Sequence, residues 1–298
     1  MPRPIAALLL LVATMLWGFA FLAQKSAMQS LDPLSFTGAR YLLGGLLVLP
    51  IAMIEGRRQV RRPLSRRHWH ATLALSLVFF LGTWLQQWGL ETTTVTNGGF
   101  LTGLYVMFVP LIAYLVTRQR SHPILLLGVP LALFGIYLLN GGRLDGLNSG
   151  DLLIISCAVF WAIHILLLGV IAHQTARPIL VSCITFLAAG LLSTLLALVF
   201  ETPSVEGLSQ AWIAIAYAGI ASTAIGFTLQ AIGQQHVPPA NAAIILSAES
   251  LFAALGGAVV LGERLPPIGY LGAGLIFTAI VLVEAIPPLW ARRRSYST

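Results

Sequence analysis

Glu249 is the one carboxylate that stands well inside an apolar stretch of the chain, in the run IILSAES over residues 244–250. If this stretch crosses a membrane, an unpaired carboxylate at that depth costs several kcal/mol and needs a cation, a hydrogen-bond donor or a proton. One interpretation is that Glu249 binds a substrate or a proton. The other is that it makes a hydrogen bond that fixes its helix against a neighbour. The first is favoured, because Val109, the residue that aligns with it locally in the first half of the chain, is not a carboxylate.

Two tryptophans, Trp17 and Trp161, stand near the middle of apolar runs rather than at their ends. Anchoring at the membrane interface, the usual role of membrane tryptophans, therefore does not explain them. They could fill the core, or they could line a cavity that holds aromatic or cationic solutes by stacking and cation–π attraction, and cavity lining is favoured. His164 follows Trp161 by one turn on the same face. Taken alone, this histidine is more typical of a hydrogen-bonded core residue than of a proton carrier.

The composition is that of an integral membrane protein. Hydrophobic residues make up 57% of the 298 residues, charged residues only 9%, and the mean hydropathy is +0.87. An average soluble domain has roughly 25% charged residues. The net charge of +7 and the pI near 10.0 could suggest nucleic acid, but the basic residues occur in short bursts between apolar runs, as membrane topology signals do. We therefore expect lipid, and not nucleic acid, around this chain.

Stretches of about 20 apolar residues, bounded by charge, proline or glycine, predict ten membrane-spanning helices. They lie near residues 4–25, 34–54, 70–90, 95–117, 123–140, 150–172, 178–200, 210–233, 240–261 and 266–288. Strands are excluded because only a helix satisfies its backbone groups within a single span, and these runs are too uniformly apolar for a barrel. The first run is too long for a signal peptide and no small-x-small cleavage site follows it, so we expect it to be retained. The predicted fold class is all-α integral membrane.

The distribution of Lys and Arg predicts the orientation. Thirteen of the seventeen fall on the side that holds the N-terminus, namely Arg3, Arg57, Arg58, Arg61, Arg62, Arg66, Arg67, Arg118, Arg120, Arg177 and Arg292–Arg294. On the other side fall Lys25, Arg143 and Arg264, together with Asp32, Glu91, Asp145, Glu201, Glu206 and Glu263. Because positive charge accumulates inside, both termini are predicted to be cytoplasmic, in a bacterial cytoplasmic (inner) membrane.

The chain repeats itself at an offset of 144 residues. The matched pairs include Trp17 with Trp161, Gly82 with Gly226, Gln86 with Gln230, Gly89 with Gly233 and Asn97 with Asn241. Five helices in each unit are an odd number, so the second unit enters the membrane from the opposite side. The predicted architecture is therefore two inverted five-helix repeats, over residues 1–140 and 141–298, as in many secondary transporters.

Gly82, Gln86 and Gly89 form one stripe of the predicted helix near 70–90, and the matched residues form a second stripe near 210–233. Small residues allow helices to pack closely, and an amide inside a span needs a partner or a water-filled cavity. Close packing and a cavity-lining gate are both open interpretations. A pair of symmetric gates would place Gln86 and Asn97 toward the outer side, and Gln230 and Asn241 toward the inner side.

Arg40 lies about two turns inside the predicted helix near 34–54. We expect its side chain to extend to the outer headgroups, with an anion contact inside a cavity as the alternative. Cys157 and Cys183 both fall in apolar runs and are interpreted as packing residues rather than a disulfide. A His-Glu-x-x-His motif, a Gly-x-Ser-x-Gly motif and a phosphate loop are absent from the sequence, so an enzyme is not expected.

Taken together, these features resemble the drug/metabolite transporter superfamily, in its ten-helix group with two EamA domains. The likeness covers nearly the whole chain, from about residue 5 to 288. The residues that carry it are the Trp17-Gly18 pair, the LYVMFVP stretch that ends at Pro110, the Gly262-Glu263 pair, and the glycine-rich surroundings of Gly128 and Gly272. The group often has a Glu-Pro pair where this chain has Glu249-Ser250, so the kink that a proline would cause is not expected.

The resemblance implies a central substrate cavity, walled chiefly by the first, third, fourth, sixth, eighth and ninth helices, with no cofactor and no metal. The candidate lining residues are Trp17, Gln86, Asn97, Phe100, Tyr105, Trp161, His164, Gln230, Asn241 and Glu249.

The predicted function is a secondary active or facilitative transporter that exports small organic metabolites, such as amino acids or similar amphiphilic solutes, by alternating access. One alternative is proton-coupled efflux of organic cations or drugs, with Glu249 exchanging a proton for the cation. An integral membrane enzyme with His164 or His236 as its base is an alternative of another class, although no second catalytic group can be placed beside either. A channel is disfavoured because no charge ring or filter sequence is seen. The expected partners are a small-molecule substrate and the lipid bilayer, with the protein a monomer or a dimer.

Overall fold

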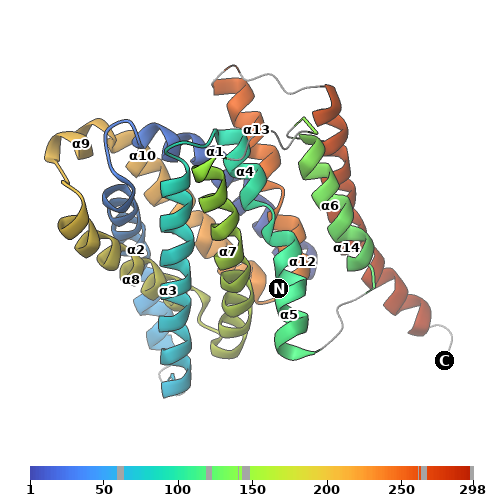
Figure 1. The fold of residues 1–298 in the computed structure, drawn as a ribbon. Helices are drawn as coiled ribbons and strands as arrows, with labels where there is room; N and C mark the ends of the chain where they lie inside the picture. Colours follow the sequence, from blue (N-terminus) through green and yellow to red (C-terminus); the bar gives the residue numbers. More distant parts are fainter. Residues whose placement is uncertain are drawn as a thin grey trace.

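The computed structural model describes residues 1–58, 64–118, 123–139, 141–142, 148–260, 262 and 267–295, and within these ranges all regular structure is helical (Figure 1). The first half contains α1 (Arg3–Ala27), α2 (Pro33–Arg58), α3 (Arg66–Gly89), α4 (Val95–Thr102), α5 (Tyr105–Thr117) and α6 (Leu125–Leu139). The second half contains α7 (Ser149–Thr175), α8 (Pro178–Phe200), α9 (Val205–Gln210), α10 (Trp212–Ala216), the π-helix η1 (Tyr217–Phe227), α11 (Thr228–Gln234), α12 (Pro239–Leu246), α13 (Glu249–Val260) and α14 (Pro267–Ser295). The predicted all-helical fold is thus confirmed for these ranges.

Eight helical stretches of the described chain are long and apolar enough to cross a membrane. They are α1, α2, α3, α4 with α5, α7, α8, the stretch from α10 to α11, and α12 with α13. Two further apolar helices, α6 and the Pro267–Leu282 part of α14, are 10–17 residues long, short of the roughly 20 residues that a span requires. A multi-pass membrane protein is confirmed, while the count of ten spans stays a prediction.

Part of the topology prediction rests on residues outside the described ranges: Arg61, Arg62, Arg120, Arg143, Asp145, Glu263 and Arg264. The side chains of Arg58, Glu284 and Arg292–Arg294 are also outside the description.

Two predicted helices are interrupted at matched positions. The one near 95–117 divides into α4 and α5 at Gly103 and Leu104, and the one near 240–261 divides into α12 and α13 at Ser247 and Ala248. The offset of 144 residues relates the two breaks. The expectation that the second helix lacks a kink without a proline is wrong: the Ser247 and Ser250 hydroxyls each bond a carbonyl three residues earlier, both at 2.7 Å. Such local bonds give the backbone an alternative to the helical ladder.

The predicted helix near 210–233 is not a uniform α-helix. Its central part is η1, in which the Thr223 hydroxyl donates to the carbonyl of Ala218, five residues earlier, at 2.7 Å. The matched segment of the first half, residues 73–83, belongs to α3 and is α-helical throughout. π-helical turns are rare and often occur at functional sites, so the two halves differ at this segment.

Helices α2 and α8 pack side by side at one edge of the bundle and cap each other (left in Figure 1). The Glu201 carboxylate, just after α8, accepts the backbone N–H groups of Leu34 and Ser35 at 2.8 Å. Glu55, near the end of α2, accepts the N–H of Leu180 at 2.7 Å. Each carboxylate satisfies donors that a helix N-terminus leaves open, so the pair is joined at both ends.

Helices α6 and α14 pack together at the opposite edge (right in Figure 1). Their backbones meet at glycines: a Cβ added to Gly135 would lie 2.8 Å from the carbonyl oxygen of Gly272. Side chains at this crossing would separate the helices, as expected of a small-residue contact between membrane helices. The remaining helices enclose the centre of the molecule between these two edges.

The matched glycines Gly89 and Gly233 are close-packing positions. A Cβ on Gly89 would lie 2.8 Å from the carbonyl oxygen of Gly150 on α7, and a Cβ on Gly233 would lie 3.0 Å from that of Ala6 on α1. For these two members of the predicted stripes, the structure shows packing rather than a gate. The same crossings direct the glutamines of the stripes toward the interior.

Candidate functional site

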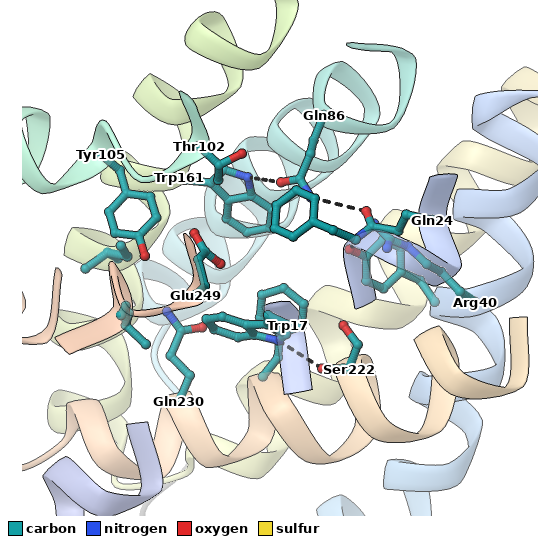
Figure 2. A pocket seen from close by; sticks show the side chains of 15 residues that line it. Trp17, Gln24, Arg40, Gln86, Thr102, Tyr105, Trp161, Ser222, Gln230 and Glu249 are labelled. Atoms are coloured by element: carbon teal, nitrogen blue, oxygen red, sulfur yellow. Dashed lines mark hydrogen bonds between the residues drawn. The ribbon is translucent and has the colours of Figure 1, made fainter. Parts of the chain in front are cut away.

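A cavity lies at the centre of the bundle, where the two interrupted helices meet α1, α2, α3, α7 and the η1–α11 stretch (Figure 2). Its lining includes six of the ten predicted residues: Trp17, Gln86, Tyr105, Trp161, Gln230 and Glu249. The rest of the lining consists of Phe21, Gln24, Arg40, Tyr41, Thr102, Ile165, Ser222, Phe227 and Leu246. The matched residues of the two halves are therefore brought together around one space.

The cavity is contracted in this conformation. The space around the lining atoms, including its open side, amounts to about 470 Å³, but the centre of a water molecule fits into only about 40 Å³. At about 10–15 Å³ per water molecule by this measure, the cavity holds roughly three waters. A metabolite can enter only when side chains or helices move.

Aromatic rings form the centre of the site. Phe227, at the end of η1, lies 4.5 Å from Trp17 and 5.6 Å from Trp161 between ring centroids. The Trp161 and Phe227 planes are 17° apart and therefore stack, and Phe79 contacts Phe227 edge to face at 4.9 Å. The two tryptophans from matched positions thus meet through one phenylalanine. Faces of this kind attract apolar, aromatic and cationic groups.

Trp161 belongs to a hydrogen-bonded chain that crosses three helices. Its Nε1 on α7 donates to Gln86 Oε1 on α3 at 2.7 Å, and Gln86 Nε2 donates to Gln24 Oε1 on α1 at 3.1 Å (Figure 2). Gln24 and Gln86 are buried. A buried amide requires such partners, so the chain fixes the orientation of the Trp161 indole.

Trp17 is held differently. Its Nε1 donates to the backbone carbonyl of Ser222 in η1 at 3.1 Å (Figure 2), and a Cβ on Gly226 would lie 2.7 Å from the same nitrogen. The Oε1 atom of Gln230, matched to Gln86, is buried and has no hydrogen-bond partner among the described residues. The predicted symmetry of the residues is present, but the symmetry of their hydrogen bonds is not.

Glu249 and Tyr105 are the first residues of the two second half-helices, α13 and α5. They are separated by 144 residues, so Tyr105 occupies the position that corresponds to Glu249, and the local alignment with Val109 is wrong. The phenol lies close enough to the carboxylate to interact with it. Tyr105 Oη and Glu249 Oε1 nevertheless lack a well-formed hydrogen bond within the described chain. Binding sites of transporters commonly form at such helix breaks.

Arg40 does not reach the membrane surface, so the expectation that it contacts headgroups is wrong. Its side chain is 2% exposed and lines the cavity. Its Nη2 donates to the Tyr41 hydroxyl at 2.8 Å, and its guanidinium lies 4.5 Å from the centre of the Tyr41 ring and 5.4 Å from that of Phe36. Sequence reasoning missed this placement because hydropathy does not show which way a side chain on an apolar helix points.

Four predicted residues are not among those that line the cavity. Phe100 is buried in the hydrophobic core, Asn241 is buried on α12, and Asn97 is half-buried in the first turn of α4. His164 is buried with its ring centroid 5.2 Å from that of Phe79 and 5.4 Å from that of Trp161. Its Nδ1 lacks a hydrogen-bond partner in the described part of the chain. The roles of all ten residues stay predictions.

His236 lies apart from this cavity, beside a second, more open hollow of about 370 Å³ between α7, α11 and α12. Desolvation lowers its pKa, and so do the N-terminal amino group and His173. Among the described residues, no group of His, Cys, Asp and Glu could hold a metal ion. Cys157 and Cys183 are buried and free.

Comparison with known proteins agrees with this architecture. The chain matches the EamA-like transporter family over residues 4–141 and again over residues 148–285. An uncharacterized transporter of Archaeoglobus fulgidus is 31% identical over 277 residues, which are 92% of this chain and 84% of that protein. The uncharacterized inner membrane transporter YedA of Escherichia coli K12 is 26% identical over 279 residues, 90% and 87% of the two chains.

A solved crystal structure has the same fold, with a TM-score of 0.78 at 22% identity over 98% of this chain and 99% of the other. The family match covers both halves, and the archaeal relative aligns over most of its length. This chain therefore belongs to the EamA-like transporter family of the drug/metabolite transporter superfamily and is a membrane transporter.

Proposed function

We propose that this chain exports small amphiphilic metabolites, amino acids or similar solutes, from the bacterial cytoplasm by alternating access. In this proposal it has ten membrane-spanning helices in two inverted repeats, 1–140 and 141–298, and acts as a monomer in the cytoplasmic membrane with both termini inside. The observation that carries the proposal is the central cavity. Trp17 and Trp161, from matched positions, and the carboxyl group of Glu249 all line it.

Reciprocal contacts support the inverted repeat. The helix breaks at Gly103–Leu104 and Ser247–Ala248 are separated by 144 residues, and Glu201 and Glu55 cap the partner helices α2 and α8 in the same way. An inverted repeat presents one central site to either side in turn. These features favour a carrier whose two halves exchange roles.

The size of the cavity favours a carrier over a channel. With about 40 Å³ open to water, the centre has room for roughly three waters and no room for a metabolite. Transport of a solute therefore requires side chains or helices to move, which agrees with alternating access.

Counterflow of radiolabelled amino acids into proteoliposomes tests the proposal. We expect saturable exchange of at least one solute from a panel of the common amino acids, and its loss when Glu249 and Trp161 are both replaced by alanine. Liposomes containing heat-unfolded protein are the control for leakage. The absence of saturable exchange across the whole panel by folded protein would contradict the proposal.

A second candidate, proton-coupled efflux of organic cations, is favoured by the surroundings of Glu249. Glu249 is 5% exposed and lines the cavity, and Tyr105 on α5 is the described group that acts on its carboxyl group. A buried carboxylate without a cation can exchange a proton for a cationic solute. Glu249→Gln should then remove the dependence of transport on an imposed pH gradient. Unchanged coupling in this variant would exclude the second candidate.

A further inference from the structure

We propose that Arg40 recognises an anionic group of the transported solute and that the solute is therefore a zwitterion, with its anionic end at Arg40 and its cationic end at Glu249. The inference rests on the proposed function, because it assigns a substrate class to the same cavity. It arises from a buried arginine and a buried carboxyl group that line one space without pairing with each other.

Arg40 is a buried cation with incomplete hydrogen bonding. Its side chain is 2% exposed, and its Nε has no hydrogen-bond partner in the described chain. Within the described ranges its guanidinium contacts the hydroxyl and ring of Tyr41 and the ring of Phe36, and neither residue is an anion at neutral pH. A buried charge is unfavourable unless it is paired and fully hydrogen-bonded. A planar guanidinium with free donors matches the geometry of a carboxylate.

Glu249 presents the opposite case at the other end of the site. Its Oε1 has no hydrogen-bond partner among the residues that the structure places. Figure 2 shows Glu249 and Arg40 well separated, with Trp17 and Trp161 on either side of the space beside Glu249. The two charges do not satisfy each other in this conformation, and aromatic faces lie between them.

One solute that carries both charges satisfies both side chains. A carboxylate at Arg40 and an ammonium at Glu249 would each gain a charge-assisted hydrogen bond, and an apolar or aromatic part would contact Trp17, Trp161 and Phe227. A simple cation would leave Arg40 buried without a counter-ion. A simple anion would leave the carboxyl group of Glu249 without a cationic partner. An α-amino acid with an apolar or aromatic side chain is the smallest solute that meets all three requirements.

A purely structural Arg40 makes a different prediction about stability. If the arginine serves only to hold Tyr41 and Phe36, its replacement should lower the unfolding temperature of the ligand-free protein. If it awaits an anion, Arg40→Leu removes an uncompensated buried charge, and the ligand-free protein should be as stable as the wild type or more stable. Ligand-free stability therefore separates the two roles before any solute is added.

The test compares three forms of each of two solutes, phenylalanine and leucine: the free amino acid, its methyl ester and its N-acetyl derivative. Binding is measured by thermal shift of the purified full chain in nanodiscs, and transport by counterflow in proteoliposomes. The variants are Arg40→Leu and Glu249→Gln. Arg66→Leu is the matched control, since it makes the same substitution at an exposed arginine that does not line the cavity.

We expect the free amino acid to bind the wild type at least about 30-fold more tightly than either derivative, the ratio expected when one partner of a buried charge pair is lost. Arg40→Leu should abolish the preference for the amino acid over its ester, and Glu249→Gln the preference over the N-acetyl derivative. Arg66→Leu should retain both preferences. Each variant should unfold within a few degrees of the wild type.

Equal binding of ester and amino acid by the wild type, with saturable transport of both, would overturn the zwitterion inference and leave the carrier in place. A clear fall in the ligand-free unfolding temperature of Arg40→Leu, with unchanged selectivity, would assign Arg40 a structural role and overturn the inference. Absence of binding and transport for all six compounds by folded protein would count against the proposed amino acid carrier as well.

Discussion

The two tryptophans of the central cavity occupy matched positions but have different partners. Trp161 donates to the side chain of Gln86, which in turn donates to Gln24, and the helix that carries Gln86 is regular. Trp17 donates to the backbone carbonyl of Ser222, in a π-helical segment, while Gln230 Oε1 has no hydrogen-bond partner within the described ranges. The indole N–H of Trp161 therefore bonds a side-chain amide, whereas the indole N–H of Trp17 bonds the backbone.

Under the proposed inverted repeat, this difference would distinguish the two states of the transport cycle. If the halves exchange roles, the opposite state should have Trp17 bonded to Gln230, the segment of η1 wound as an α-helix, and Trp161 released from Gln86. The Ser222 carbonyl, which accepts from Trp17 in the π-helical segment, should then bond within the α-helix instead. Four predictions test or sharpen the comparison.

The largest expected effect is at the matched glycines beside the tryptophans. A Cβ on Gly226 would lie 2.7 Å from Trp17 Nε1, whereas the nearest atom to a Cβ on Gly82 is Phe160 Cβ at 3.4 Å. Gly226→Ala should therefore cost about 1–3 kcal/mol through overpacking and impair transport. Gly82→Ala should be neutral or stabilise by up to about 1 kcal/mol. Unfolding of both variants in nanodiscs checks this, and equal effects would show that the two tryptophans are equivalent in the membrane.

The second effect concerns the matched glutamines. Gln86→Met removes the acceptor of the Trp161 indole and leaves a buried N–H unpaired, which should cost about 1–3 kcal/mol. Gln230→Met removes an amide oxygen that has no partner among the described residues, so its cost should be below about 1 kcal/mol. Chemical unfolding of the two variants gives the comparison. A larger loss for Gln230→Met would mean that the Trp17–Gln230 bond already dominates in solution.

A third, smaller difference should appear in backbone dynamics. The amides of η1, residues 217–227, should exchange hydrogen about tenfold faster than those of residues 73–83 in α3, because a difference near 1.4 kcal/mol in local opening suffices. Mass spectrometry of peptides from the two segments measures it. Equal protection would indicate that the π-turns are as stable as the α-helix.

The smallest effect is expected at the helix breaks. Ser250 and Val106 are the second residues of α13 and α5, and each backbone N–H bonds a carbonyl three residues earlier, at 3.2 and 3.1 Å. Proline is tolerated in the first turn of a helix, so Ser250→Pro should change stability by less than about 1 kcal/mol. Val106→Pro should cost more, because both residues are buried but only Val106 contributes an apolar side chain to the hydrophobic core. The order of the two melting temperatures checks it, and the reverse order would mean that the second break depends on its serine hydroxyls.

The helices and the matched residues could be predicted from sequence because both depend on residue type alone. An apolar run of the right length must be a helix in lipid. Residues that repeat at one offset can be found by comparing the sequence with itself, without a structure. The same reasoning brought Trp17, Trp161, Gln86, Gln230, Tyr105 and Glu249 to one site. The same reasoning failed where the outcome depends on the direction of a side chain or on the local backbone conformation.

Arg40 and the breaks illustrate the failures. A helix that is apolar on all sides gives no sign of which face lines the cavity. The sequence therefore predicts, wrongly, that the Arg40 side chain extends to the membrane surface. Ser247 and Ala248 carry no proline or glycine signal, and a π-turn leaves no mark in composition. Phe227 could have been found, because it follows the matched Gly226 directly; Ser222 acts through its backbone, which no side-chain pattern shows.

The mutual capping of α2 and α8 has a consequence for how the bundle can work. If one helix slid along the other, the hydrogen bonds of both Glu201 and Glu55 would break. The two helices should therefore move together as one rigid pair. Arg40 belongs to this rigid pair, whereas Glu249 begins a half-helix just past an interruption. A solute bound by both side chains would connect the rigid pair to the half-helix that can bend.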